Sequence, residues 1–269
     1  MTNPSDGSGT PPLGRCRRSC VGEGSTVEEQ TYQEEASTDE ALQCLLTART
    51  VLYGLLARAF GAEPDSNLLA LMTDEAVVEA AALLLDGEAG HPSLAGKMVE
   101  TAQEVTLDEA AGQYTRLFIG PGTLPSPPWE SVHLGADRLI FQESTLAVRD
   151  AYRRGGFKAA GYPREPDDHL GTECSFMAAL AQRTGDAWAA DNKEAALSDL
   201  AIQRDFLDRH LLRWIGLFSC RLREAPAALR AGTLYPVLAE VAERFCQVDR
   251  GLIDELTTAL GEASGIEGH

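Results

Sequence analysis

The chain has 269 residues, of which 41 are acidic and 23 basic, so its formal charge at pH 7 is −18. This charge repels a polyanion, which disfavours nucleic acid as a partner, and it attracts a short cationic peptide. No apolar run approaches the roughly 20 residues that span a bilayer, so we expect no membrane insertion. Acidity also serves solubility alone, and the composition does not decide between the two roles of the charge.

The hydrophobic share of 44% is enough to build one substantial core, or one core with a small satellite. The six cysteines, at positions 16, 20, 44, 174, 220 and 246, show no Cys-x-x-Cys spacing. A chain of this size does not need disulfides, so we expect ordinary thiols in a reducing compartment. Cys16 and Cys20 flank a basic turn, which leaves a metal or redox role for them open.

Residues 1–37 are rich in Gly, Ser, Pro, Thr and Glu and hold almost no large apolar side chains. Such a segment cannot offset the entropy lost on ordering, so we predict a disordered acidic tail. It contains Arg17 and Arg18, but no apolar stretch of about 7 to 15 residues follows them. The arginine pair is therefore not predicted to belong to an export signal.

Residues 38–260 are predicted to form one all-helical domain of roughly nine to eleven helices, followed by a frayed end at 261–269. Apolar side chains recur at the three- and four-residue spacings of one helix face. The first such stripe consists of Leu42, Leu45, Leu46, Leu52, Leu55, Leu56, Ala59 and Phe60. Runs of alternating valine and isoleucine are missing from the sequence, so strands are expected to be scarce.

Boundaries inside this domain are indicated by local signals. Thr106 and Glu109 have the spacing of a capping box, which predicts a helix start. The segment 184–186, Thr-Gly-Asp, predicts a turn. The last helices are predicted over Thr233–Val248 and Leu252–Leu260.

The segment from Leu124 to Trp129 contains prolines at positions 125, 127 and 128. Each proline fixes φ and withholds an amide donor, so this segment is predicted to be a rigid extended loop. A tryptophan on a stiff loop is a good low-entropy anchor for a peptide. The alternative is that Trp129 fills the core while the prolines shape the turn.

The phrase Glu165-Pro-Asp-Asp-His169 is predicted to open a helix, with Pro166 at the first helical position and Asp167 and Asp168 in the first turn. Carboxylates there can simply cap the helix. A further alternative treats His169 and Glu173, one turn apart, as half of a metal site. The other histidines at 91, 133 and 210 stand alone, so a complete ligand sphere is hard to assemble.

Three phrases together carry a resemblance: Leu-Phe-x-Gly-Pro at 117–121, Pro-Pro-Trp-Glu-Ser-Val at 127–132, and Glu-Pro-x-Asp-His at 165–169. In this order and spacing they resemble the TorD/DmsD family of cytoplasmic chaperones for molybdenum-cofactor oxidoreductases, over roughly 42–260. The resemblance implies an all-α, single-domain helical bundle of the TorD/DmsD type, which is cytoplasmic and without catalysis. From the residues themselves we expect no cofactor and no metal. The resemblance also implies that the protein binds the twin-arginine signal peptide and apo catalytic subunit of a molybdopterin oxidoreductase, and delays export until cofactor insertion.

The resemblance also implies a set of signal-peptide-binding residues: Trp129, Glu130, His133, Pro166, Asp168 and His169. Asp168 is expected to meet a guanidinium of the partner, because arginine and carboxylate form two parallel hydrogen bonds. His169 would orient Asp168 or donate to the peptide backbone. His133 stands where many relatives have an aromatic residue.

Two alternatives from other classes stay open at this point. A structural helical adaptor would explain the leucine stripes equally well but not the three phrases. A metal-dependent enzyme would use His169 and Glu173. The identity of the client reductase and the formation of a homodimer also stay open.

Overall fold

The structure, a computed structural model, describes residues 27–86, 93–121, 123–135, 143–160, 166–225 and 234–262, with side chains from 39 to 261 within these ranges. This part of the chain contains no strand, so the predicted all-α fold is confirmed. It forms eleven α-helices and two short π-helical stretches: α1 (Val27–Gly61), α2 (Ser66–Met72), α3 (Glu75–Leu85), α4 (Leu94–Glu104), α5 (Leu107–Tyr114), η1 (Thr115–Ile119), α6 (Glu130–Leu134), α7 (Glu143–Arg154), α8 (Leu170–Ala189), α9 (Lys193–Phe206), η2 (Leu207–Leu211), α10 (Leu212–Glu224) and α11 (Leu234–Glu262).

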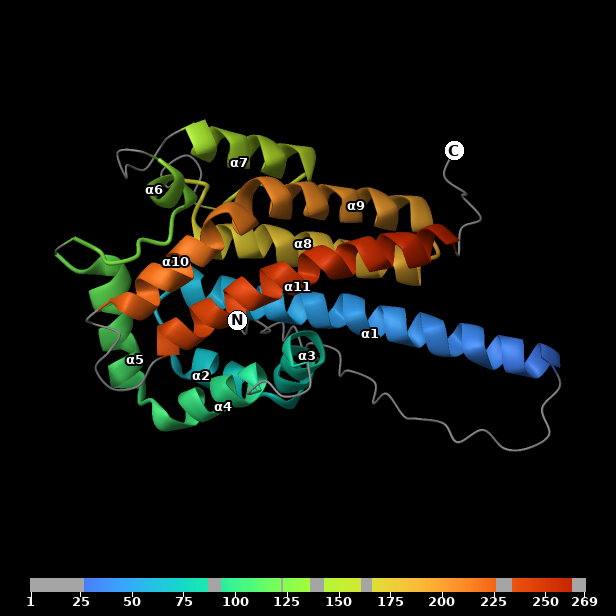
Figure 1. Cartoon of the computed structure of the whole chain (residues 1–269), viewed down its shortest axis with the longest axis horizontal. Coiled ribbons are helices and arrows are strands. Elements are labelled where there is room, and N and C mark those ends of the chain that lie inside the picture. The colour runs from blue at the N-terminus through green and yellow to red at the C-terminus, as the bar shows by residue number, and fades with distance from the viewer. Residues whose placement is uncertain are drawn as a thin grey trace, which may run out of the picture.

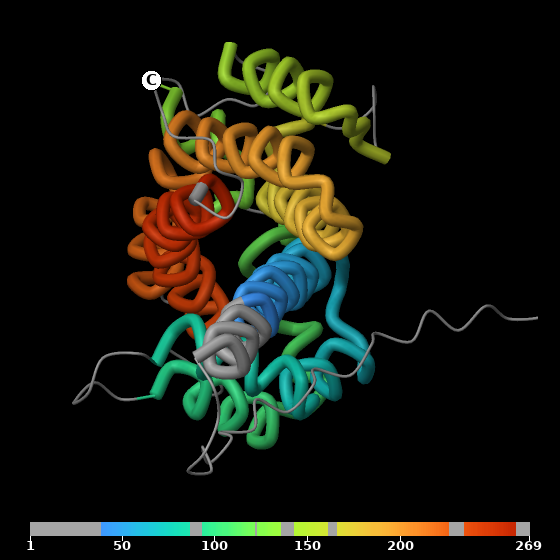
Figure 2. The backbone as a smooth tube through the Cα atoms, turned by 90° about the vertical axis from the view of Figure 1, so that its right-hand side faces the viewer, coloured from blue at the N-terminus to red at the C-terminus, as the bar shows by residue number. Residues whose placement is uncertain are grey.

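Helices α1, α8, α9 and α11 form the centre of the molecule and run side by side along its long axis (Figure 1). Turned by 90°, the same helices are seen nearly end-on (Figure 2). The leucine stripe of α1 lies at this centre, where Leu46, Leu52 and Leu56 are buried. Helices α2 to α4 cover one side, and α6 and α7 lie on the opposite side (Figure 1).

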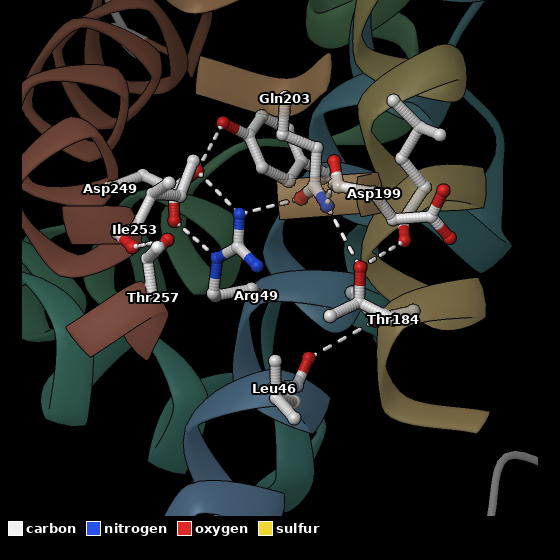
Figure 3. A network of polar contacts seen from close by, with 11 residues as sticks. Leu46, Arg49, Thr184, Asp199, Gln203, Asp249, Ile253 and Thr257 are labelled. Carbon is white, nitrogen blue, oxygen red and sulfur yellow. Dashed lines mark hydrogen bonds and ion pairs between the residues drawn. The ribbon is translucent and has the colours of Figure 1, made fainter. Parts of the chain in front are cut away.

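A buried polar network fastens the four central helices together (Figure 3). Arg49 of α1 donates through Nε and Nη2 to the carboxylate of Asp249 on α11, at 2.5 and 3.1 Å. The same Nη2 donates to Gln203 Oε1 of α9 at 2.6 Å, and Gln203 donates to the Thr184 hydroxyl of α8 at 2.9 Å. Removing one partner of a buried ion pair costs about 3 to 5 kcal/mol. The network therefore fixes the relative positions of α1, α8, α9 and α11.

The capping box is confirmed, because the Thr106 hydroxyl accepts from the Glu109 amide and the Glu109 carboxylate accepts from the Thr106 amide. The start of α1 differs from the prediction. The helix begins at Val27, so residues 27–37 are helical rather than part of a disordered tail. Their Glu, Gln and Ala residues are strong helix formers, and this local propensity outweighs the scarcity of large apolar side chains in the segment. Residues 1–26, with Cys16 and Cys20, and residues 263–269 lie outside the described part.

Two predicted breaks are wrong. α8 continues through Gly185, because Thr184 and Gly185 are buried and the Thr184 hydroxyl bonds within the helix to the Leu180 carbonyl. α11 continues through Gly251, whose exposed position costs a helix only about 1 kcal/mol. Within the described ranges, no helix combines the length and apolar character needed to cross a membrane.

Candidate functional site

The proline loop is held against the start of α8 by backbone pairing. Trp129 and His169 form an isolated antiparallel bridge, in which the Glu130 amide donates to the Asp168 carbonyl and the Leu170 amide donates to the Pro128 carbonyl, both at 2.9 Å. Proline has no amide to give, so the loop can pair through its carbonyls and through the first amide after Trp129. The two phrases of the sequence therefore meet in space.

Asp168 stabilises the junction between the proline loop and α8 through buried hydrogen bonds. It is fully buried, and its carboxylate accepts from the Ser131 amide at 2.8 Å, at the start of α6, and from the Thr145 hydroxyl of α7 at 2.9 Å. Both carboxylate oxygens are thus used inside the protein. The prediction that Asp168 meets a partner guanidinium does not fit this placement, and we assign it a positioning role instead.

Asp167 is also buried. It therefore does not face solvent, as a residue that only caps the first turn of a helix would. Its carboxylate pairs with Arg149 Nε at 2.6 Å, and its carbonyl accepts from the Tyr152 hydroxyl at 2.9 Å. Both partners belong to α7. The segment before α8 therefore holds α7 in place through Asp167 and Asp168.

His169, rather than Pro166, Asp167 or Asp168, marks the helix start. It is the N-cap of α8, and its Nδ1 accepts from the Gly171 amide at 3.1 Å. Pro166 therefore precedes the helix instead of occupying its first position, and Glu165 lies outside the described residues. Burial lowers the pKa of His169 to about 4, against a smaller opposite effect of Asp168. The ring is neutral near pH 7, so its proton sits on Nε2 and is available to an acceptor.

A close approach of two helices places His169 beside α1. A Cβ on Gly171 would lie 2.5 Å from the Cα of Gly61, so only glycine fits there. Sequence reasoning missed this contact, because each glycine alone is typical of a helix end. The approach brings the end of α1, the π-helical η1 and the start of α8 around one groove.

The groove has a volume of about 690 Å³, within the range of ordinary ligand sites. The lining is mostly apolar and consists of Ala57, Arg58, Gly61, Ala62, Tyr114, Phe118, Ile119, Pro128, Trp129, Phe157, Ala160, Pro166, His169, Gly171, Thr172 and Ser175. Three predicted site residues, Trp129, Pro166 and His169, line it together. The indole of Trp129 meets the imidazole of His169 edge to face, with ring centroids 5.1 Å apart.

Sequence reasoning missed two apolar residues of this groove, Ile119 and Phe157. Ile119 is 61% exposed, which is high for a residue of its type, and Phe157 is half-buried. Arg58 stands among them and is held by Asp65 at 2.8 Å and by the Glu63 carbonyl at 3.2 Å. The groove therefore combines apolar side chains with polar groups such as those of Arg58 and His169.

Glu130 and His133 do not line the groove. Glu130 is 1% exposed and accepts from His210 Nδ1 of η2 at 3.0 Å. His133 is buried, with Nε2 at 2.8 Å from the Pro127 carbonyl and Nδ1 at 2.8 Å from Arg221 of α10. Both side chains therefore anchor α6, to η2 through Glu130 and to α10 through His133.

The metal alternative gains no geometric support. His169 caps α8 beside the groove, whereas Glu173 is buried and accepts from Trp214 Nε1 at 3.2 Å. Among the residues that the structure describes, no group of three or more His, Cys, Asp and Glu side chains could hold a metal ion.

Comparison with known proteins gives the family. The model of the nitrate reductase delta subunit family matches residues 76–219, more than half of the chain. The chain belongs to this family. The resemblance to TorD and DmsD chaperones is thereby confirmed.

Three relatives show how far the similarity of this family member extends. The Tat proofreading chaperone DmsD of Salmonella typhimurium is 43% identical over 98 residues, which are 36% of this chain and 46% of that protein. The chaperone protein TorD of Vibrio cholerae serotype O1 (strain M66-2) is 30% identical over 175 residues, 64% of this chain and 74% of that protein. The TorD protein of a Psychrobacter species is 26% identical over 224 residues, 81% of this chain and 96% of that protein. The chain thus spans under half the length of the DmsD relative that it matches.

Proposed function

We propose that this protein is a system-specific chaperone that binds the twin-arginine signal peptide of an apo molybdenum-cofactor oxidoreductase. By covering the leader in the cytoplasm, it would delay export until the cofactor has been inserted into the catalytic subunit. The observation that carries the proposal is the apolar groove in which Trp129, Pro166 and His169 meet. The family membership and the names of the relatives support the same function.

The groove suits the apolar stretch of a leader. Trp129 and Pro128 are fixed by backbone pairing to α8, so they lose little freedom when a peptide binds. Ile119 and Phe157 offer apolar area that water now covers in part, and burying it stabilises a complex by roughly 25 cal/mol per Å². A peptide helix or extended segment laid along this surface would contact both walls.

The polar part of recognition would come from two sources. The imidazole of His169 has a hydrogen on Nε2 that no described residue accepts, and it lines the groove, where a peptide carbonyl can accept it. The overall charge of −18 would steer the arginine pair toward the protein before contact. We expect this steering to weaken as salt is added.

Isothermal titration calorimetry with three synthetic peptides tests the proposal. The first has two consecutive arginines followed by about 12 apolar residues. The second replaces the arginines by glutamines, which removes the positive charge that the acidic protein attracts. The third replaces the apolar residues by serines. We expect the first to bind at least about tenfold more tightly than the second, and the third not to bind.

Competition extends the test to the whole client. The apo catalytic subunit with its leader should displace the first peptide, and the same subunit without the leader should do so much less. If none of the peptides gives heat, the leader-binding function is wrong and the structural adaptor becomes the better account.

A further inference from the structure

Behind the proline loop lies a buried cluster of carboxyl groups that the groove does not use. Glu130 of α6 is 1% exposed, and Asp168 and Glu173 are fully buried. The cluster joins three elements far apart in the sequence: the loop that carries Trp129, the start of α8, and the η2–α10 segment that contributes His210 and Trp214.

The donors to these carboxyls are unequally distributed. Asp168 accepts two hydrogen bonds, from the Ser131 amide and the Thr145 hydroxyl, and Glu130 accepts from His210. Glu173 accepts only the Trp214 indole N–H, at 3.2 Å, and its Oε1 has no hydrogen-bond donor among the described residues. Neither Glu130 nor Glu173 forms an ion pair with a described lysine or arginine.

Glu173 and Glu130 face each other within hydrogen-bonding reach. If both were carboxylates, neither would have a hydrogen to give, and two like charges would be buried side by side. If Glu173 is a neutral acid, its O–H has an acceptor in Glu130 and the repulsion disappears. Glu173 and Glu130 each have one donor group, but His210 lies within reach of both oxygens of Glu130, whereas the neutral Trp214 indole reaches only one oxygen of Glu173. Glu173 is therefore the group on which a proton is least costly.

We propose that Glu173 holds a proton at neutral pH and, through Glu130, positions Trp129 and the α6–α8 junction for leader binding. The effect on leader binding rests on the proposed function, whereas the assignment of a proton to Glu173 does not. Glu130 directly follows Trp129 in the chain, and Glu173 lies one helical turn after His169, so the pair spans the two walls that meet at the backbone bridge. Loss of the proton would set two carboxylates against each other behind that bridge.

The surroundings of Glu173 agree with this assignment. Burial, followed by the charges of Glu130 and Asp168, raises the pKa of Glu173 well above its usual value of 4.5. The other titratable groups in its electrostatic reach are Tyr152 of α7, Cys174 of α8 and Cys246 of α11, whose pKa values are raised chiefly by burial, so all three stay neutral. The only ionisable nitrogen hydrogen-bonded to this cluster, within the described residues, is His210 on Glu130.

The substitution Glu173→Gln tests the assignment, because glutamine has the shape of the protonated acid and donates to Glu130 without titrating. Glu79→Gln is the matched control, since Glu79 is an exposed residue of α3 away from the cluster. Infrared spectra at neutral pH should show the carbonyl band of a protonated carboxyl in the wild type and in Glu79→Gln, and the band should be lost in Glu173→Gln. A band that persists unchanged in Glu173→Gln, or a wild type without any such band, overturns the proton assignment.

The second readout is the affinity for the synthetic twin-arginine peptide between about pH 6 and about pH 9, a range that lies above the usual glutamate pKa. We expect the wild type and Glu79→Gln to weaken by about tenfold toward the alkaline end. Glu173→Gln should bind as the wild type does at the acid end and stay nearly constant. A wild-type profile that Glu173→Gln reproduces would contradict the coupling to the groove. If no variant binds the peptide at any pH, the proposed function fails, whereas the infrared result still decides where the proton is.

Discussion

Trp129 and His169 lie against each other in two ways, through a backbone bridge and through an edge-to-face contact of their rings at 5.1 Å. The bridge fixes the loop to α8, and the ring contact aligns the two side chains along one wall of the groove. This single relationship explains why a proline-rich loop and a helix start occur together in the sequence. It also separates residues that face the groove from residues that only hold it.

Replacing Trp129 by alanine should weaken binding of the twin-arginine peptide by at least about tenfold, because a large anchor on a rigid loop is removed. Calorimetry measures the loss, and near-UV circular dichroism checks the fold. Trp188→Ala is the control, since Trp188 is also half-buried but lies at the far end of α8. Equal losses of affinity for the two variants would remove Trp129 from the site.

His169→Asn should separate capping from binding. Asparagine is a good N-cap, so the stability of α8 should change little, while the Nε2–H donor in the groove is lost. We expect peptide affinity to fall by roughly tenfold, the effect of one hydrogen bond of about 1.4 kcal/mol. Unchanged affinity would show that the leader does not use this donor.

The same variant should change the acid sensitivity of the protein. The pKa of His169 is about 4 in the folded state and 6.5 ordinarily, so the unfolded chain binds the extra proton between these values. The contribution of His169 to stability is therefore present above about pH 6.5 and is lost as the pH falls toward 4. Denaturant unfolding at several pH values should show a shallower acid decline for His169→Asn than for the wild type. Parallel declines would mean that His169 titrates normally in the folded protein.

Asp168→Ala should act on stability first. Its loss leaves the Ser131 amide and the Thr145 hydroxyl without this acceptor in a buried place, which we expect to cost about 2 to 3 kcal/mol. Asp150→Ala on the exposed face of α7 should stay within about 0.5 kcal/mol. Urea unfolding distinguishes them. A stable Asp168→Ala protein with a selective binding defect would restore the direct contact that the sequence suggested.

Gly171→Ala should disturb the groove through the backbone. The added Cβ would lie 2.5 Å from Gly61, so α1 and α8 must separate, at an expected cost of about 3 kcal/mol. Gly251→Ala is the matched control, because its Cβ would meet nothing within 4 Å on an exposed helix face, and it should stabilise the protein by about 0.5 to 1 kcal/mol. Melting temperatures compare the two, and a neutral Gly171→Ala would contradict the close approach.

The sequence predicted the all-helical fold, because the fold follows from local periodicity. The resemblance placed Trp129 and His169 in one set of binding residues, but their contact with each other was not predicted. The sequence could not predict which residue caps α8. Asp167, Asp168 and His169 are all compatible with a helix start, and the choice depends on pairing with the distant proline loop. The sequence also could not predict the role of Glu173, because the partners of this side chain come from the distant helices α6 and α10. Likewise, Gly185 and Gly251 each predicted a break in a helix from local sequence. Packing keeps α8 continuous through Gly185, and the long α11 continues through Gly251.

Photo-crosslinking tests most directly where the leader lies. A photo-reactive leucine placed in the middle of the apolar stretch of the twin-arginine peptide would be activated in the complex, and mass spectrometry would locate the adducts. The account predicts adducts on the groove between α1, η1 and α8, at Ile119, Trp129, Phe157 or Thr172. Adducts confined to the second cavity beside α7 and η2, lined by Ser144, Ala147 and Arg213, or spread evenly over the surface, would contradict it.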